Sequence, residues 1–149
     1  MGDVLRERAL RLLARREHTR QEISRKLAPL AESAEQLEAL LDELTQRGWL
    51  SDQRYVVARY ASRAARLGDA RLAYELRARG VSDELVGDAL ASGESELTRA
   101  RRVWQQRFGS EAAVTVSAAE LSRQMRFLAA RGFSGATIRR LLRVPIEDE

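Results

Sequence analysis

The chain has 149 residues, 32% of them charged and 44% apolar, with a formal net charge of +4 at pH 7. This length suits one domain or a few small repeated units, and the apolar share excludes a disordered chain. Without cysteine there are no disulfides or thiolate-bound metals, and without a long apolar run or a signal-like start we expect a soluble, cytoplasmic protein with no membrane partner.

Helical periodicity begins near the start and continues through most of the chain. In the first fifty residues, apolar side chains recur at spacings of three and four, as one face of a helix requires. These positions are Leu5, Ala9, Leu12 and Leu13, then Ile23 and Leu27, then Leu37, Leu40, Leu41 and Leu44. The segment AAVTV at 112–116 is the only short stretch that resembles a strand. An all-α fold is therefore expected.

Residues that start and stop helices punctuate this pattern. In a capping box, a Ser or Thr oxygen accepts a backbone N–H and a Glu or Gln three residues later reaches back. Three such pairs predict helix starts: Thr19 with Glu22, Ser33 with Gln36, and Ser117 with Glu120. Glycines in the left-handed conformation are expected to end helices at Gly48, Gly68, Gly80, Gly109 and Gly132.

Two segments nearly repeat each other, RARGVSDELVGDAL and AARGFSGATIRRLL. When Leu76 is aligned with Leu128, a glycine follows after four residues, a serine after six, an aliphatic residue after ten and a leucine after fourteen. Leu27 begins a third copy, which keeps the serine and both later core positions but has Ala31 in place of glycine. The successive copies are offset by 49 and 52 residues.

These copies predict three tandem three-helix repeats, namely repeat 1 at 5–50, repeat 2 at 52–92 and repeat 3 at 95–143, followed by an acidic tail at 144–149. A unit of under about fifty residues buries too little surface to be stable alone, so each repeat must cover an apolar face of its neighbour. The expected result is one continuous stack that forms an elongated, curved molecule. Most aromatic side chains would pack in its core, and Tyr74 is the expected exception because charged residues flank it.

The sign of the charge alternates along the chain. Net charge is +5 over residues 5–26, −5 over 27–52, +5 over 53–79, −5 over 80–96 and +8 over 97–144. Two interpretations are open: the charges pair across the surface, or they polarise the molecule so that positive faces meet an anionic partner. The unbalanced basic last third favours the second interpretation.

Catalytic signatures are absent from the sequence. There is no phosphate-binding glycine loop, and His18 is the only imidazole, placed just before the Thr19 cap, where a structural role is expected. One helix has an acidic face, but a single helix cannot supply enough converging oxygens for a metal ion. That face consists of Glu35, Glu38, Asp42 and Glu43. We expect neither enzyme activity nor a cofactor nor a metal site.

Arginines crowd repeats 2 and 3, and guanidinium groups bind phosphate in a bidentate manner. No helix shows the short polar side chains of a sequence-reading first turn, so binding to single- or double-stranded DNA is expected to be weak and independent of sequence. The candidate binding residues, chosen by local basicity, are Arg63, Arg66, Arg71, Tyr74, Arg77, Arg79, Arg123, Arg126, Arg131, Arg139 and Arg140. Further basic residues of repeat 3 are Arg99, Arg101, Arg102, Arg107 and Arg143.

Four segments resemble the recurring segments of the RecX family, whose members regulate the RecA recombinase. They are ALRLLARREHTRQEISRKL, LTQRGWLSDQRYVVARYASRAARLG, RLAYELRARGVSDELVGDAL and MRFLAARGFSGATIRRLL, and together they cover nearly the whole chain. The resemblance implies an array of three-helix repeats that binds the RecA–DNA filament and inhibits its ATP hydrolysis, strand exchange and growth. It also implies a role in homologous recombination, DNA repair and the SOS response, and it supplies no catalytic residue.

Other functions remain open at this stage. The chain could be a helical protein that binds DNA independently of sequence, or a scaffold protein with no effect on the recombinase. Nothing in the sequence demands more than a monomer.

Overall fold

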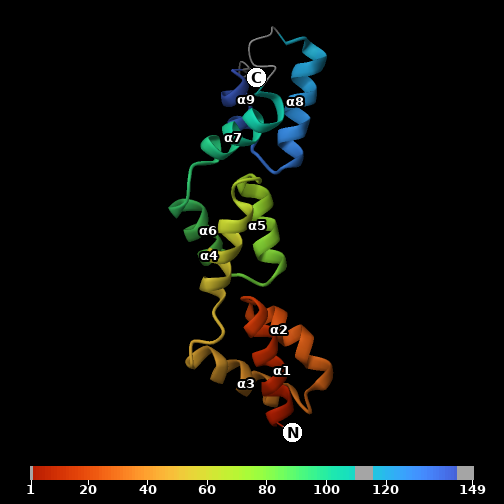
Figure 1. Cartoon of the computed structure of the whole chain (residues 1–149), viewed down its shortest axis with the longest axis vertical. Helices are drawn as coiled ribbons and strands as arrows, with labels where there is room; N and C mark the ends of the chain where they lie inside the picture. The colour runs from red at the N-terminus through yellow and green to blue at the C-terminus, as the bar shows by residue number, and fades with distance from the viewer. Residues whose placement is uncertain (1, 110–115, 144–149) are drawn as a thin grey trace. The chain divides into compact units, whose positions relative to one another are not determined.

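The computed structural model describes residues 2–109 and 116–143 (Figure 1), and in these residues every regular element is a helix. The elements are α1 (Gly2–Arg15), α2 (Arg20–Leu27), the short 3₁₀ helix η1 (Ala28–Leu30), α3 (Ala34–Gln46), α4 (Asp52–Arg63), α5 (Asp69–Ala78), α6 (Asp83–Ser92), α7 (Glu96–Phe108), α8 (Ala118–Ala130) and α9 (Gly135–Leu142). The all-α prediction is confirmed. The predicted acidic tail and all but the last residue of the AAVTV segment lie outside the described residues. None of the described helices is both long and apolar enough to cross a membrane.

The chain divides into two compact units. Unit 1 contains Met1–Ala58 and Leu76–Val86, and unit 2 contains Arg59–Glu75 and Gly87–Glu149. The divisions fall inside α4, α5 and α6, so the helices of repeat 2 contribute to both units. The boundaries of the compact units therefore differ from those of the sequence repeats. The exact boundaries of the repeats stay a prediction.

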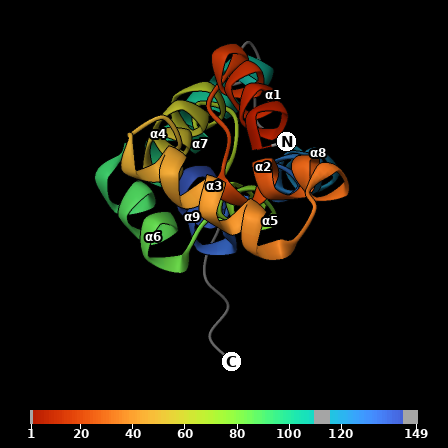
Figure 2. The same cartoon turned by 90° about the horizontal axis from the view of Figure 1, so that it is seen from below.

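Unit 1 is built around α1, α2 and α3, which lie together in Figures 1 and 2. Their apolar stripes meet in one core, because each helix repeats its apolar residues every three or four positions. The core consists of Leu5, Ala9, Ile23, Leu27, Leu37, Leu40, Leu41, Leu44 and Leu50. Leu12 and Leu13, also predicted for this core, are partly buried at its edge.

Unit 2 contains two apolar clusters among its described residues. The first joins α7, α8 and α9 through Ala100, Val103, Leu128, Phe133 and Ile138. The second joins the end of α4 to α5 through Ala64, Leu67 and Leu72, with Tyr60 and Leu90 packed against it. Leu128 and Ile138 are two of the positions that the internal repeat aligned, so the repeated apolar positions are core positions here.

The predicted helix starts are confirmed. Thr19 caps α2 with a complete capping box, in which its hydroxyl accepts the N–H of Glu22 and the Glu22 carboxylate accepts the N–H of Thr19. Ser33 caps α3 and Ser117 caps α8, each accepting the N–H three residues on. Each cap satisfies a backbone donor that the helix itself leaves unpaired.

Four of the five predicted glycine stops lie at helix ends, and three of these four have the predicted left-handed conformation. Gly48, Gly80 and Gly132 are left-handed, with φ of +76°, +83° and +88°. Gly109 ends α7 in the right-handed region, with φ of −57°. Gly68 is not left-handed either, but an added Cβ would lie 2.3 Å from the backbone of Gly132. Gly68 is therefore needed for close approach and not for its own conformation.

A hydrogen bond to the carbonyl oxygen of an arginine joins consecutive repeats, and it occurs twice. In unit 1 the Thr19 hydroxyl donates to the carbonyl oxygen of Arg79 over 2.6 Å. With the offsets of 49 and 52 residues, Thr19 corresponds to Gly68 and Arg79 corresponds to Arg131. In unit 2 the Gly68 N–H donates to the carbonyl oxygen of Arg131 over 2.9 Å. The sequence repeat therefore corresponds to a repeated way of joining one three-helix group to the next.

The glycine after each arginine makes this contact possible. An added Cβ at Gly80 would lie 2.7 Å from Cβ of Gln21, and one at Gly132 would lie 2.3 Å from Cβ of Arg71. Ala31, which occupies the matching position of repeat 1, has φ of −78° and makes its backbone hydrogen bonds inside its own repeat. An L-residue fits there, which explains why the first copy lacks the glycine.

Candidate functional site

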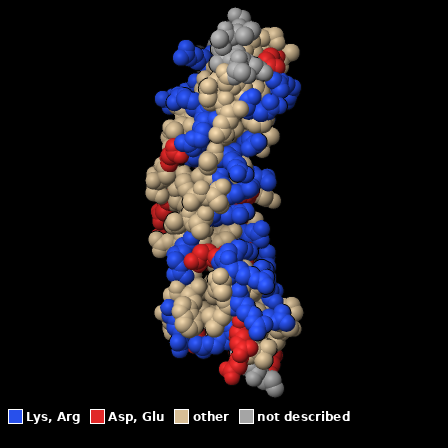
Figure 3. All heavy atoms as spheres, viewed as in Figure 1, with Lys and Arg blue, Asp and Glu red and all other residues tan. Residues whose placement is uncertain are grey.

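On the face shown in Figure 3, basic side chains cover more of the surface than acidic ones do. Many arginines nevertheless have carboxylate partners. On the acidic face of α3, Glu38 and Asp42 accept hydrogen bonds of 2.5 Å and 2.8 Å from Arg20 of α2. Part of the charge alternation is thus pairing between neighbouring helices. Within the described ranges no cluster of acidic and imidazole side chains is arranged to hold a metal ion.

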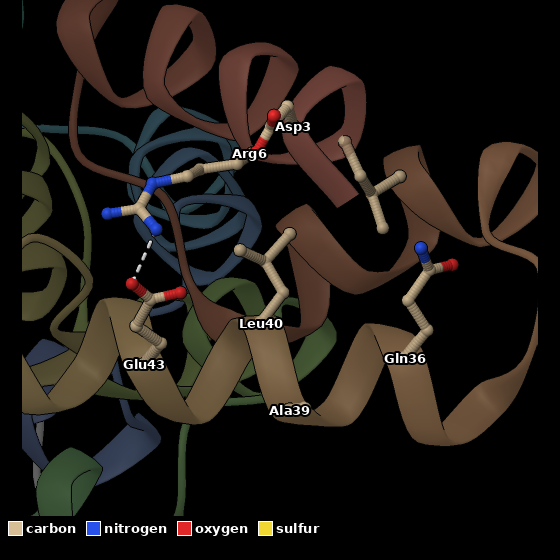
Figure 4. Close-up of a pocket in the computed structure, with 7 residues that line it drawn as sticks. Asp3, Arg6, Gln36, Ala39, Leu40 and Glu43 are labelled. Atoms are coloured by element: carbon tan, nitrogen blue, oxygen red, sulfur yellow. Dashed lines mark hydrogen bonds and ion pairs between the residues drawn. The ribbon is translucent and has the colours of Figure 1, made fainter. Parts of the chain in front are cut away.

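A second pairing spans the pocket of Figure 4, which has a volume of about 250 Å³ and lies between α1 and α3. Arg6 of α1 reaches across it to Glu43, with Nη1 2.6 Å from Oε1. Arg47 also pairs with Glu43, over 3.2 Å. Arg6 and Glu43 already neutralise each other, so neither charge is free for an ionic ligand in this pocket.

Four of the candidate residues of unit 2 lie at the end of α4, on α5 or in the turn between these helices. They are Arg63, Arg66, Arg71 and Tyr74. Arg63 donates to Glu75 over 2.7 Å, and this hydrogen bond lowers the pKa of Glu75. The Arg71 guanidinium lies 5.7 Å from the centre of the Tyr74 ring, and the Tyr74 side chain is 66% exposed. Arg66 is exposed in the turn that follows α4. A cation beside an exposed aromatic ring can stack on a base or on a partner's side chain.

The remaining candidates of unit 2 lie on α8 and α9. Arg126 and Arg140 are exposed and have no ion-pair partner in the part of the chain that the structure describes. Arg123 is exposed but pairs with Glu120 over 2.6 Å. The two unpaired guanidinium groups are available to an anionic partner, and Arg123 would have to give up an existing contact.

Arg131 and Arg139 are half-buried and have structural contacts. The Arg131 guanidinium lies 5.0 Å from the centre of the Phe127 ring, while its carbonyl oxygen accepts the hydrogen bond from Gly68. The Nε of Arg139 is buried and has no hydrogen-bond partner among the described atoms. The turn that carries Arg131 lies against Arg71, so these candidates from repeats 2 and 3 come close together.

Two candidates lie elsewhere. Arg77 and Arg79 belong to unit 1, where Arg77 pairs with Asp83 over 2.8 Å and Arg79 lies 3.6 Å from Glu22. The division of repeat 2 between the units separates these two arginines from Arg63 and Arg71. The structure therefore distributes the eleven candidates over both units, with most of them in unit 2.

Arg99 is not a surface arginine, contrary to its place in the basic region expected for repeat 3. Its side chain is 1% exposed and pairs with Asp69. It also donates to the carbonyl oxygens of Glu94, over 2.8 Å, and Leu67, over 3.3 Å. One helical turn separates Arg99 from the core residue Val103, and that spacing was the available signal for burial. The high arginine content of the chain concealed it.

Glu96, at the start of α7, is a second residue whose role only the structure shows. Its carboxylate accepts the N–H of Asp69 over 2.8 Å, the N–H of Ser134 over 3.0 Å and the Ser134 hydroxyl over 2.9 Å. Burial alone would raise the pKa of Glu96, but hydrogen bonds from Thr137, Ser134 and Asp69 lower it. An ionised Glu96 therefore ties the starts of α5 and α9 to α7.

The structural role expected for His18 is confirmed. The ring is 2% exposed, and Nδ1 lies 3.0 Å from the carbonyl oxygen of Arg16. Burial lowers the pKa of His18, which keeps the ring neutral beside Lys26, whose Nζ lies 3.5 Å from Nε2.

The expectation for the aromatic residues is mostly confirmed. Tyr55, Phe108 and Phe133 are buried, and Tyr74 is the most exposed aromatic side chain of the described chain. Trp49 differs from the expectation, because it is 41% exposed and lies beside two arginines.

The chain matches three family models, described as the first, second and third three-helix domains of RecX, over residues 6–44, 51–90 and 94–142. A regulatory protein RecX of Chromobacterium violaceum is 45% identical over 148 residues, which cover 99% of this chain and 95% of the relative. Another, of Leptothrix cholodnii, is 47% identical over 141 residues, covering 94% and 88%. The crystal structure of RecX from Lactobacillus salivarius matches with a TM-score of 0.82, over 95% of this chain and 94% of that one. Its sequence identity is 16%, so this likeness shows the fold alone.

Proposed function

Because the chain belongs to the RecX family of regulatory proteins, we propose that it binds the filament that RecA forms on DNA and inhibits the filament's ATP hydrolysis, strand exchange and growth. The relatives are named regulators, and the chain is not an enzyme. Its effect on the recombinase must then come from binding alone. Such a complex would place the protein in the cytoplasm.

Unpaired basic side chains on the surface of unit 2 support this proposal most directly. Arg66, Arg126 and Arg140 are exposed and make no ion pair with a described residue. Arg71 and the exposed Tyr74 add a cation and an aromatic ring to the same unit. Guanidinium groups suit both DNA phosphates and acidic side chains of a protein subunit. A filament of protein on DNA presents both.

Inhibition follows if the chain binds one state of the filament better than another. A ligand shifts an equilibrium by its difference in affinity between two states. To slow hydrolysis tenfold, the chain must bind the resting filament about 1.4 kcal/mol more tightly than the state in which hydrolysis occurs. One or two charge-assisted hydrogen bonds, lost when neighbouring subunits rearrange, are enough to supply that difference.

The test is DNA-dependent ATP hydrolysis by the cognate RecA, with this protein titrated at ratios below one molecule per RecA subunit. We expect inhibition at substoichiometric ratios, weaker at higher salt because the contacts are ionic. The control repeats the titration with a heat-unfolded sample. Unchanged hydrolysis, under conditions where the protein demonstrably binds DNA, contradicts the proposal and leaves sequence-independent DNA binding in its place.

A further inference from the structure

A basic pocket opens between α1 and α2 in unit 1, and none of the candidate residues discussed above lines it. Its volume is about 550 Å³, and no carboxylate lines it. The lining residues are Arg8, Arg11, Leu12, Arg15, Lys26 and Leu27. We propose that this pocket binds consecutive phosphate groups of a single nucleic-acid strand.

The three arginines of this pocket differ from most other basic residues of unit 1 by lacking partners. Arg8, Arg11 and Arg15 make no ion pair or hydrogen bond with any described side chain, and all three are exposed. Apart from Arg25 and the pocket residue Lys26, the remaining Lys and Arg residues of unit 1 pair with carboxylates. The pairs are Arg6 with Glu43, Arg16 with Glu22, Arg20 with Glu38, Arg47 with Glu43, Arg54 with Glu17, Arg77 with Asp83, and Arg79 with Glu22.

This concentration of unpaired charge is unfavourable in the free protein. Arg8, Arg11 and Arg15 follow one another at spacings of three and four, which places them on one face of α1, where like charges repel. Lys26 adds a fourth cation from α2, next to the neutral ring of His18. A polyanionic ligand would turn this repulsion into attraction.

The spacing favours a nucleic-acid strand over an acidic peptide. From Arg8 to Arg15 the helix rises by about 10 Å, which spans about three of the intervals of roughly 3.4 Å of axis that separate successive phosphates of one strand. Each guanidinium can grip a phosphate with two parallel hydrogen bonds. Leu12, half-buried between the arginines, offers an apolar contact for a sugar or a base. Carboxylates on one face of an extended acidic peptide recur only about every 6.6 Å, so fewer of them would face this row.

The pocket is a second binding region, beyond the proposed function, and its test needs no recombinase. The full chain is titrated against a fluorescent oligothymidine at several salt concentrations, and binding is followed by anisotropy. The variant R8Q/R11Q/R15Q removes the row of arginines. The matched control R6Q/R47Q/R54Q removes the same charge from paired arginines of the same unit. Circular dichroism checks that both variants keep their helices.

We expect the pocket variant to bind the oligonucleotide about tenfold more weakly at low salt, and its slope of log affinity against log salt to fall by about 2, because three phosphate contacts are lost. The control variant should keep the wild-type slope. R8K/R11K/R15K, which keeps the charge but loses the bidentate geometry, should recover the slope and only part of the affinity.

Three results would overturn the proposal. The first is an equal loss of affinity for the oligonucleotide in the two glutamine variants, which would mean that net charge alone causes the loss. The second is a pocket variant that binds the oligonucleotide as tightly as the wild type but no longer binds inorganic tripolyphosphate, which the wild type does bind. This result would assign the pocket to a small polyphosphate. The third is competition by polyglutamate as strong as that by the oligonucleotide, which assigns it to an acidic protein segment. A failed ATPase assay would leave all of these readings intact, so the two proposals fail separately.

Discussion

Single glycines make the close contacts between consecutive repeats possible. Gly80 and Gly132 are left-handed and also face the preceding repeat, whereas Gly48 is left-handed with nothing within 4 Å of an added Cβ. Gly68 is needed only because the backbone of Gly132 comes so close. A substitution at each position therefore tests a different physical requirement.

We predict that Gly132→Ala destabilises the protein much more than Gly48→Ala. Both substitutions place a side chain in the left-handed region, which costs about 1 kcal/mol. Only the methyl group added at position 132 would also collide with Arg71, so the total cost there is about 2–4 kcal/mol. The free energy of unfolding in urea, followed by circular dichroism, measures both. Equal losses would mean that the join between repeats 2 and 3 contributes little to stability.

At the scale of the helices, one buried and one half-buried polar side chain hold α7 in place. Arg99 binds Asp69 and two carbonyl oxygens, and Glu96 binds the starts of α5 and α9. These contacts provide partners for the buried guanidinium charge, which would be costly to bury alone. The guanidinium therefore serves packing and not recognition.

We predict that Arg99→Met lowers the free energy of unfolding by about 2–3 kcal/mol, less than the loss of a fully buried pair because Asp69 stays partly exposed. The same change at Arg101, which is exposed on the same helix, should alter stability by no more than about 0.5 kcal/mol. Thermal and urea unfolding of the two variants provide the measurement. If Arg99→Met is as stable as the wild type but binds DNA more weakly, Arg99 is a recognition residue after all.

At the scale of the whole chain, the arginines fall into a structural group and a free group. The first includes buried Arg99 and the surface arginines that pair with carboxylates. The second includes Arg66, Arg126 and Arg140 in unit 2, and the pocket arginines in unit 1. Only the second group can bind an anionic partner without first breaking a contact, so net charge by itself overstates the binding surface.

We predict that replacing Arg126, Arg131, Arg139 and Arg140 by alanine weakens inhibition of RecA ATP hydrolysis about tenfold or more, since several ionic contacts are lost together. Helix content should be unchanged, because all four are on the surface or half-buried at it. The measurement is the concentration that halves hydrolysis.

Alanine at Arg6, Arg47, Arg54 and Arg102 is the matched control for this variant. It removes the same charge from arginines that pair with carboxylates. Full inhibition by the folded first variant would exclude this face of repeat 3 from the interface with the filament.

The sequence by itself determined the helices and their arrangement into copies. These features depend on a few neighbouring residues, because a helix start or face is determined by side chains one turn apart. They are the caps at Thr19, Ser33 and Ser117, the apolar stripes of repeat 1 and the offsets between copies. The same local reading identified Tyr74 as exposed and His18 as structural.

Only the tertiary structure decided what each arginine and glycine does. Arg99 and Arg126 belong to the same basic stretch, and their roles differ because Asp69, thirty positions from Arg99, lies beside one of them. Gly68 looked like a helix stop, and only the packing of Gly132 against it shows why it is glycine. The unpaired row of Arg8, Arg11 and Arg15 likewise became visible once the carboxylate partners of the other basic residues were known. Pairing and burial depend on which helix faces meet, and that information is not contained in any single stretch of the chain.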